Sequence, residues 1–241
     1  MTQKKVMKNT FKTFGYVISL LAFCAGVACA AANEAVLALA KKEQPGLLQT
    51  MKELVEIESG SADFEGLEKI AALIASRLKD LGAKVEMIEP GPDTYKMFDT
   101  PEKIGRMVKG TFTGTGTKKI LLIAHMDTVY PRGMLSGQPF KVEGDRAYGL
   151  GIADDKQGVA VVLHTLAILN ALNFRDYHTL TVLINADEEI GSPGSQGRIT
   201  RLGAEHDAVM SFEGGGPAGG TATIRLATSG TAHAVLSVRG R

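Results

Sequence analysis

The stretch Lys118-Lys-Ile-Leu-Leu-Ile-Ala-His-Met-Asp-Thr-Val-Tyr130 constrains the fold of this chain more than any other segment. It contains an unbroken apolar run, Ile120–Ala124, which is typical of a strand covered on both faces in a parallel sheet. His125 and Asp127 follow this run, and side chains two residues apart point the same way from an extended backbone. An imidazole supported by a carboxylate is a common arrangement at metal sites. By itself His-x-Asp is also an ordinary strand end, so its meaning depends on the rest of the chain.

The first 31 residues have the pattern of a secretory signal peptide. Four lysines precede Phe14–Ala32, a run of 19 residues without a charged side chain, and Ala28-Cys29-Ala30 offers a cleavage site between small residues. An uncleaved membrane anchor is the alternative, because 19 such residues can just span a bilayer. A lipoprotein anchored through Cys24 or Cys29 is a weaker alternative. We expect an exported protein, periplasmic or secreted, that contacts a membrane only through this segment.

Both cysteines lie within the predicted signal peptide, so the mature chain would have neither disulfides nor thiolate ligands. Without the four lysines of that segment, 23 basic residues stand against 26 acidic residues, which gives a net charge of −3. A mildly acidic chain without a basic run is a poor candidate for nucleic-acid binding. Any metal site must therefore use histidine and carboxylate ligands.

Strands and helices alternate along the rest of the chain, which predicts an α/β fold with a mainly parallel sheet flanked by helices. The predicted helices cover residues 33–58, 65–81, 158–172 and 192–202. The predicted strands cover residues 83–89, 104–113, 120–124, 179–186, 208–212, 222–227 and 232–238.

Several local features refine this prediction. Pro45 is expected either to break the first helix or to open a second helical segment, and Gly82 is placed for a left-handed helix end. Thr113-Gly-Thr-Gly116 is expected to form a hairpin turn, since the Gly-Lys-Ser/Thr of a phosphate loop is missing. Residues 140–148 predict a short hairpin that turns at Gly144-Asp145. The helix at 158–172 is apolar almost all round, which predicts that it is buried.

One histidine and six acidic residues follow three of the predicted strands or precede one predicted helix. The group consists of His125 and Asp127, Glu188 and Glu189, Glu213, and Asp154 and Asp155. Ligands of open α/β sheets bind outside the carboxyl ends of the strands, so we expect these side chains at one sheet edge. Each alone has an ordinary interpretation as a core histidine, a helix cap or a solvated turn. Together the carboxylates would oppose one another's ionisation, and a divalent metal ion such as zinc would compensate their charge.

Four motifs now become specific: His125–Tyr130, Gly151–Lys156, Asp187–Ser192 and Ser211–Glu213. They resemble, in order and spacing, the motifs of the dinuclear zinc exopeptidases of the glutamate carboxypeptidase (glucarpidase) and aminoacylase group. The resemblance covers almost everything after the predicted signal peptide at residues 1–31. It implies that residues 32–227 are the N-terminal part of a zinc peptidase catalytic domain. Residues 228–241 would begin an α+β lid or dimerisation domain, of which only the first strand is present.

The resemblance also implies a metal centre with two zinc ions. Asp154 would bridge the ions, His125 and Glu213 would complete the protein ligands of one, and Glu189 would bind the other. The family's second ion has a further histidine ligand that lies beyond Arg241. One ion would therefore keep three protein ligands in this chain and the other only two.

Two further residues would act on the reaction rather than bind zinc. Glu188 would be the general base for a metal-bridging water, and Asp127 would orient the imidazole of His125. The resemblance implies a cis peptide bond between Asp154 and Asp155 as well.

The expected function is hydrolysis of the amide bond to a C-terminal amino acid, in a small peptide or an N-acyl amino acid. An aminoacylase, a deacylase or a dipeptidase with the same metal core is the neighbouring alternative. A non-catalytic metal-binding remnant is the alternative from another class. We expect the chain to be a truncated form with weak or no activity. The homodimer of the complete family is not expected to carry over to it.

Overall fold

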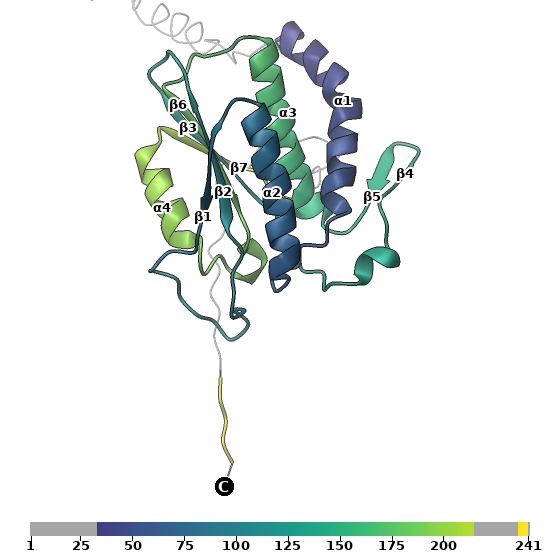
Figure 1. The fold of residues 1–241 in the computed structure, drawn as a ribbon, viewed down its shortest axis with the longest axis vertical. Helices are drawn as coiled ribbons and strands as arrows, with labels where there is room; N and C mark the ends of the chain where they lie inside the picture. Colours follow the sequence, from purple (N-terminus) through teal and green to yellow (C-terminus); the bar gives the residue numbers. More distant parts are fainter. Residues whose placement is uncertain (1–32, 215–235, 241) are drawn as a thin grey trace, which may run out of the picture. The chain divides into compact units, whose positions relative to one another are not determined.

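A five-stranded mixed sheet forms the centre of the computed structural model, which describes residues 33–214 and 236–240 (Figure 1). Its strands are β1 (Lys84–Ile88), β2 (Met107–Thr113), β3 (Lys119–His125), β6 (Thr179–Asn185) and β7 (Ala208–Ser211), in the spatial order β1-β2-β6-β3-β7. Strand β3 is parallel to both β6 and β7, whereas β2 is antiparallel to its neighbours β1 and β6. The predicted α/β class and mixed, mainly parallel sheet are confirmed.

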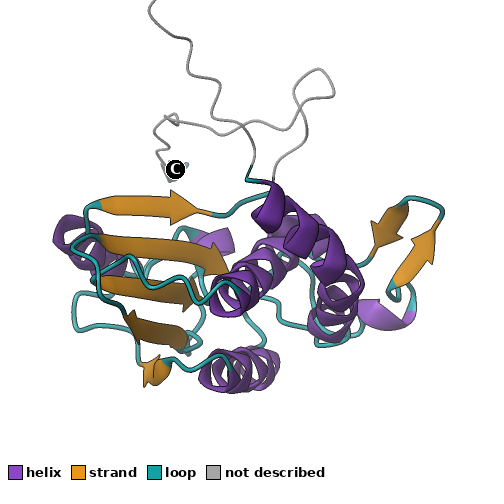
Figure 2. Ribbon diagram, turned by 90° about the horizontal axis from the view of Figure 1, so that it is seen from above, coloured by secondary structure: helices purple, strands orange, loops and turns teal. Residues whose placement is uncertain are grey.

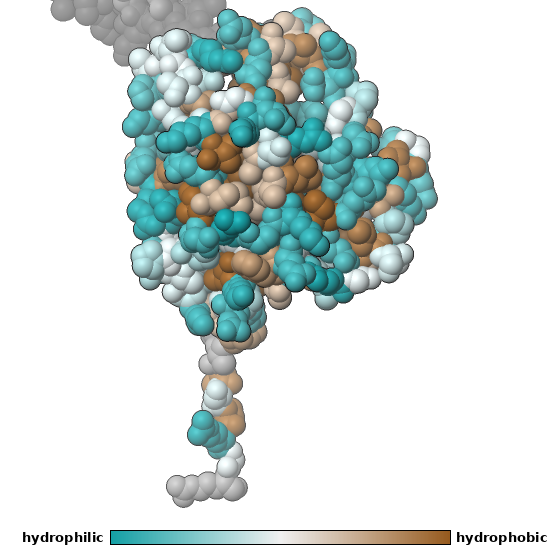
Figure 3. All heavy atoms as spheres, viewed as in Figure 1, coloured by the Kyte–Doolittle hydropathy of each residue, from teal (hydrophilic) through white to brown (hydrophobic). Residues whose placement is uncertain are grey.

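Helices lie on both faces of the sheet. Helices α2 (Phe64–Asp80) and α3 (Gln157–Ala171) lie on one face, and α4 (Gln196–Glu205) lies on the other (Figures 1 and 2). The chain divides into two compact units, residues 1–39 and 40–241, so helix α1 (Glu34–Val55) begins in the first unit. All contacts described below lie within the second unit. On the face drawn in Figure 3, polar residues cover most of the surface and apolar residues form separate patches.

Alternating side chains of the strands build two hydrophobic clusters. Leu180, Val182 and Ile184 of β6 join the larger cluster, with α2, α3 and the last turns of α1. Leu183 joins a smaller cluster that includes Leu202 of α4. Because successive strand residues face opposite sides of a sheet, a continuous apolar run supplies both clusters at once. The prediction of strands buried on both faces is thus confirmed for the centre of the sheet.

Helix α2 shows how the sequence sets its own boundaries. Leu67, Ile70 and Ile74 share one face and are fully buried against the sheet. Asp63 accepts a hydrogen bond at 3.0 Å from the backbone N–H of Gly66, which caps the first turn. Gly82 adopts the left-handed conformation expected of it, with a φ angle of 94°. The predicted amphipathic helix and its glycine terminator are confirmed.

The predicted hairpin turn at Thr113–Gly116 is wrong, because β2 and β3 do not pair with each other. Strand β6 lies between them and forms backbone hydrogen bonds along both edges. The Gly/Thr loop instead bonds to the segment before β6: the N–H of Thr115 donates to the carbonyl of Arg175 at 2.8 Å. The loop between β2 and β3 is therefore held by hydrogen bonds to the residues that precede β6, and it does not form a hairpin turn.

Three other expectations need correction. Helix α1 continues through Pro45. Proline has no N–H, so the backbone carbonyl four residues earlier lacks its helical hydrogen bond. Because this part of the helix is exposed, water can bond to that carbonyl instead. Helix α3 is buried chiefly on one face, since Val161 remains 37% exposed. Helix α4 begins at Gln196, later than the predicted residue 192, because a short turn at Glu188–Ile190 and the residues after it come first.

The small hairpin prediction is confirmed by β4 (Lys141–Glu143) and β5 (Arg146–Tyr148), with Gly144 at a φ angle of 62°. Residues 236–238 of a predicted strand have no regular structure. The predicted signal peptide, the predicted strand at 222–227 and most of the predicted lid strand lie outside the described residues. Within residues 33–214 and 236–240, no helix has the length and apolar character needed to cross a membrane.

Candidate metal centre

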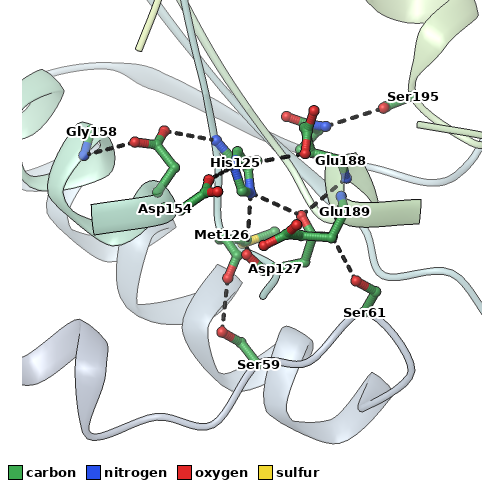
Figure 4. A network of polar contacts seen from close by, with 12 residues as sticks. Ser59, Ser61, His125, Met126, Asp127, Asp154, Gly158, Glu188, Glu189 and Ser195 are labelled. Atoms are coloured by element: carbon green, nitrogen blue, oxygen red, sulfur yellow. Dashed lines mark hydrogen bonds and ion pairs between the residues drawn. The ribbon is translucent and has the colours of Figure 1, made fainter. Parts of the chain in front are cut away.

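A buried histidine faces a group of carboxylates at the carboxyl end of β3 (Figure 4). Nε2 of His125 lies 2.9 Å from Oδ1 of Asp154, 3.6 Å from Oε1 of Glu213 and 4.0 Å from Oε2 of Glu188. The imidazole is 1% exposed, whereas the three carboxylate side chains are about half exposed. The imidazole therefore lies at the protein side of the group, and the carboxylates remain open to solvent.

The topology of the sheet explains why these residues meet. Strands β3, β6 and β7 run in the same direction, so their carboxyl ends lie at one edge. The turn Glu188–Ile190 follows β6, and Glu213 comes two residues after β7. Asp154 reaches the same edge from the segment Ile152–Lys156, which leads into α3. The structure thus brings together all the site residues that the sequence had placed at one edge.

Among residues 33–214 and 236–240, two sets of three side chains could each hold a metal ion, with their ligand atoms within 4.8 Å of one another. One set is His125, Glu188 and Glu213, and the other is His125, Asp154 and Glu189. These sets share residues with the ligands that the family resemblance implies, but they group the residues around the two metal positions differently. Glu188, the implied general base, falls in one set, and Asp154, the implied bridging ligand, falls in the other alone.

Asp127 connects the histidine to the turn that carries the two glutamates. It is fully buried, and its Oδ1 lies 3.3 Å from Nδ1 of His125. The same carboxylate accepts hydrogen bonds at 3.1 Å from the backbone N–H groups of Glu188 and Glu189. Ser61 donates its hydroxyl to Oδ2 at 2.8 Å. One carboxylate therefore positions both the imidazole and the Glu188–Ile190 turn.

Asp155 has a second contact that the sequence does not predict. As the capping interpretation expected, its Oδ1 accepts from the N–H of Gly158 in the first turn of α3, at 3.1 Å. Its Oδ2 also accepts from the backbone N–H of His125, at 3.4 Å. The peptide bond between Asp154 and Asp155 is cis, as the resemblance implied. Asp155 thus ties the end of β3 to the start of α3.

Three more supporting residues carry no local signal that sequence reasoning could have used. Ser61 belongs to the loop between α1 and α2, far from His125 in sequence. Lys156 is buried and donates its Nζ to the carbonyl of Ile57 at 2.8 Å, and burial lowers the pKa of this ammonium group to about 8. Asp187 accepts from the N–H of Gly194 at 2.6 Å and closes the loop after the Glu188–Ile190 turn. The partners of Ser61 and Lys156 are distant in sequence, and the bond of Asp187 closes a loop that forms on folding, so the folded chain identifies all three.

The electrostatics of the group favour a bound cation. Burial and neighbouring carboxylates raise the pKa of Glu189 to about 7, and they raise the pKa of Glu188 as well. The hydrogen bond from His125 lowers the pKa of Glu213. Burial by itself would lower the pKa of His125, but hydrogen bonds with Asp127 and Glu213 outweigh it and raise this pKa to about 12. The carboxylates therefore repel one another and use the imidazolium as their nearby positive charge.

These donors fit a divalent metal ion. Imidazole nitrogen and carboxylate oxygen are common ligands of zinc and related ions, and the hydrogen-bonded Nδ1 of His125 supports its Nε2 as a ligand atom. A metal ion would supply the positive charge that the crowded carboxylates need. An open α/β sheet with such a group at the carboxyl ends of its parallel strands defines a class of α/β protein with a candidate metal site at that edge.

Comparisons with known proteins agree with this class. Residues 121–234 match the sequence profile of Peptidase family M20/M25/M40. Carboxypeptidase G2 of Pseudomonas sp. (strain RS-16) is 42% identical over 221 residues, which are 91% of this chain and 51% of that protein. Acetylornithine deacetylase of Shigella sonnei is 32% identical over 163 residues, 65% of this chain and 39% of that protein. Residues 121–234 therefore match a domain of peptidase family M20/M25/M40, and the predicted recognition is confirmed.

Solved structures support the fold. An M20 family metallo-carboxypeptidase from Sulfolobus solfataricus has a TM-score of 0.56 at 23% identity, over 73% of this chain and 38% of that chain. Human carnosine dipeptidase 1 has a TM-score of 0.62 at 22% identity, over 75% of this chain and 41% of that chain. The chain spans about half the length, or less, of the curated relatives named here.

Proposed function

We propose that this chain supplies most of the two-zinc centre of a hydrolase that cleaves the amide bond to a C-terminal amino acid. The proposed substrates are small peptides and N-acyl amino acids. The observation that carries the proposal is the convergence of His125 with Asp154, Glu188 and Glu213 at one sheet edge. The 42% identity to a protein named Carboxypeptidase G2 supports the choice of reaction.

We assign the metal ligands as the family resemblance implies. His125, Glu213 and Asp154 would hold one zinc ion, and Asp154 and Glu189 would hold the other. Bound zinc would lower the pKa of a water molecule and polarise the scissile carbonyl. The backbone carbonyl of Asp127 accepts from Nδ1 of His125 at 3.1 Å, and Oδ1 of Asp127 lies 3.3 Å from the same nitrogen, which leaves Nε2 to face the metal.

Glu188 is the proposed general base. Its side chain is about half exposed, so water and substrate can reach it, and its Oε2 lies 4.0 Å from Nε2 of His125. Burial raises the pKa of this carboxyl group, and neighbouring carboxylates add to the rise, which makes it a better proton acceptor. In the reaction Glu188 takes a proton from the attacking water and passes it to the leaving amine.

A deacylase with the same centre is the second candidate, since a relative at 32% identity is named acetylornithine deacetylase. Both candidate enzymes hydrolyse an amide bond, but they recognise different substrates. N-acyl-glutamates and N-acetylornithine separate them when both are supplied at equal concentration. Preference for the glutamate series supports the carboxypeptidase, and preference for N-acetylornithine supports the deacylase.

The direct test combines zinc binding with turnover. The chain is purified, freed of metal with a chelator and reloaded with zinc, and amine release from N-acyl amino acids is measured at each stage. The proposal expects activity only in the loaded protein. The same assay is run on a version extended in frame, because the chain spans about half the length of its relatives. Binding of zinc without turnover of any substrate by the extended version would contradict the hydrolase and favour a metal-binding remnant.

We also propose that the protein is exported to the periplasm or secreted. The support is the basic start and the uncharged run of the first 31 residues. Amino-terminal sequencing of the protein recovered from each cell fraction tests this. A mature protein that starts close to residue 32 outside the cytoplasm is the expected result, and an intact Met1 in the cytoplasmic fraction would contradict export.

A further inference from the structure

A cavity of about 630 Å³ lies beside the candidate metal centre. Three segments form its walls: residues 60–65, residues 128–132 after β3, and Glu189–Ile190. Glu189 belongs both to the cavity and to one of the ligand sets. A volume of this size is typical of small-molecule sites. A substrate held at the metal centre would therefore have this cavity within reach of one side of its scissile bond.

Two walls of the cavity are fixed to each other by the backbone. The N–H of Ser61 donates to the carbonyl of Thr128 at 3.1 Å, and the N–H of Thr128 donates to the carbonyl of Ser59 at 2.9 Å. A Cβ atom on Gly60 would lie 2.4 Å from the carbonyl oxygen of Tyr130, so the close approach requires glycine. The cavity is thus preformed and needs no rearrangement of these two loops.

Three charged residues of the walls, Asp63, Glu65 and Arg132, are engaged with one another. Nε of Arg132 lies 2.9 Å from Oδ2 of Asp63, and its Nη1 lies 2.9 Å from Oε2 of Glu65. The arginine is therefore already held by two carboxylates. The other large side chains of the lining are apolar or aromatic, namely Phe64, Val129, Tyr130, Pro131 and Ile190. Val129 is 64% exposed, which leaves an apolar surface directly after the His125–Asp127 motif.

The balance of charge decides which part of a substrate this lining can accept. Asp63 and Glu65 contribute two carboxylates against the single guanidinium of Arg132, and the proposed metal ligand Glu189 borders the cavity. This excess of negative charge disfavours the carboxylate of a C-terminal amino acid. A neutral acyl group meets no such repulsion and gains from burial against apolar side chains.

We propose that this cavity binds the acyl portion of the substrate and selects neutral, apolar acyl groups, with Val129 as a specificity-determining residue. The inference rests on the proposed function, because that function defines the bond held at the metal centre. The amino-acid portion with its carboxylate then lies away from the cavity.

Binding of simple probes tests the cavity without any turnover. Acetamide, butyramide and hexanamide are titrated into the chain in the presence of chelator, and Kd values are measured by ligand-detected NMR. We expect the affinity to rise roughly threefold for each added CH₂ group, and hexanoate to bind at least about tenfold more weakly than hexanamide. Equal affinity across the amide series, or equal affinity of hexanoate and hexanamide, would overturn the proposal.

Substitution of Val129 locates the binding. Val129→Asp should weaken hexanamide binding about tenfold or more, and Val129→Leu should preserve it. Val142→Asp is the matched control, because Val142 is a comparably exposed valine in the distant β4–β5 hairpin. Thermal unfolding of each variant shows whether it is folded. If folded Val129→Asp binds hexanamide like the unchanged chain, the assignment of the cavity is wrong.

Hydrolysis separates this inference from the proposed function. The ratio of kcat/KM for N-hexanoyl-glutamate over N-acetyl-glutamate should fall in Val129→Asp and stay constant in Val142→Asp. If both substrates are hydrolysed and the ratio does not change, the acyl subsite is refuted while the hydrolase stands. If hexanamide binding depends on Val129 but no N-acyl amino acid is hydrolysed, the proposed function fails, and the acyl assignment fails with it.

Discussion

Nε2 of His125 lies 2.9 Å from Oδ1 of Asp154, and this contact joins the end of β3 to the segment that leads into α3. The two residues belong to different motifs, so the contact is a product of the tertiary fold. Asp155, next in the chain, reinforces it by accepting from the backbone N–H of His125. The candidate metal centre is therefore fixed to the sheet and to a helix at once, and four consequences of this arrangement can be tested.

Replacing His125 should strongly weaken metal binding, because its imidazole is a proposed ligand and belongs to both geometric ligand sets. We expect His125→Gln to lower zinc affinity by about 100-fold or more, a larger loss than the 10–100-fold typical of supporting residues. Competition with a chromophoric chelator measures the affinity. His178→Gln is the control, since His178 is exposed and belongs to neither set. Unchanged affinity in His125→Gln would exclude the centre described here.

Replacing Glu188 should separate proton transfer from metal binding. If Glu188 is the general base, Glu188→Gln should reduce kcat by about 10²–10⁴-fold while the zinc content stays constant. Metal analysis of the same samples gives the second readout. A parallel loss of zinc would instead identify Glu188 as a ligand, as one of the two geometric sets allows. The exposed Glu143 of β4 provides the control variant Glu143→Gln.

Ser61 should act on the metal centre through Asp127. Ser61→Ala removes the hydroxyl that donates to Oδ2 of Asp127 at 2.8 Å. Loss of this buried bond should lower zinc affinity about tenfold and the free energy of unfolding by about 1 kcal/mol. Ser61→Thr should restore both, because it keeps the hydroxyl. Ser136→Ala, at an exposed serine, is the control, and a Ser61→Ala variant with full zinc affinity would refute the role.

The ion pair between Asp63 and Arg132 should make stability depend on pH in the acid range. The hydrogen bond from Arg132 lowers the pKa of Asp63 below its ordinary value of 3.8. A lowered pKa in the folded state stabilises the protein above pH 3.8, and this contribution is lost as the pH falls through the folded-state pKa. Asp63→Asn keeps an acceptor for the helix cap but removes the charge.

Urea unfolding at pH 6 and at pH 3 measures this contribution. The difference in urea midpoint between the unchanged chain and Asp63→Asn should be present at pH 6 and smaller at pH 3. Asp145→Asn, at a side chain that is 97% exposed, controls for the loss of one negative charge. A difference that is equal at both pH values would show that the charge of Asp63 is not responsible.

The site residues could be predicted because hydrophobic runs and acidic residues alternate in the sequence itself. The apolar run Ile120–Ala124 gave a buried strand, and the residues directly after it were expected at the carboxyl end. The same logic placed Glu188, Glu189 and Glu213, since parallel strands bring their carboxyl ends to one edge whatever their order. The implied cis peptide bond at Asp154–Asp155 came from family resemblance alone, because no local pattern in the chain predicts it.

The order of the strands and the contacts between distant residues were decided by the tertiary structure. Strand β6 lies between β2 and β3. In this position its backbone forms hydrogen bonds along both edges, and its apolar side chains are buried on both faces of the sheet. Ser61 and Lys156 gained their roles from partners in other segments, and Asp187 gained its role by closing its own loop. Hydrophobic periodicity is a local property of the sequence, so it determined the helices, the strands and the His125–Asp127 strand end. Hydrogen bonds between distant segments are non-local. Only the tertiary structure therefore decided which residues hold the His125–Asp127 strand end in place and which cavity lies beside it.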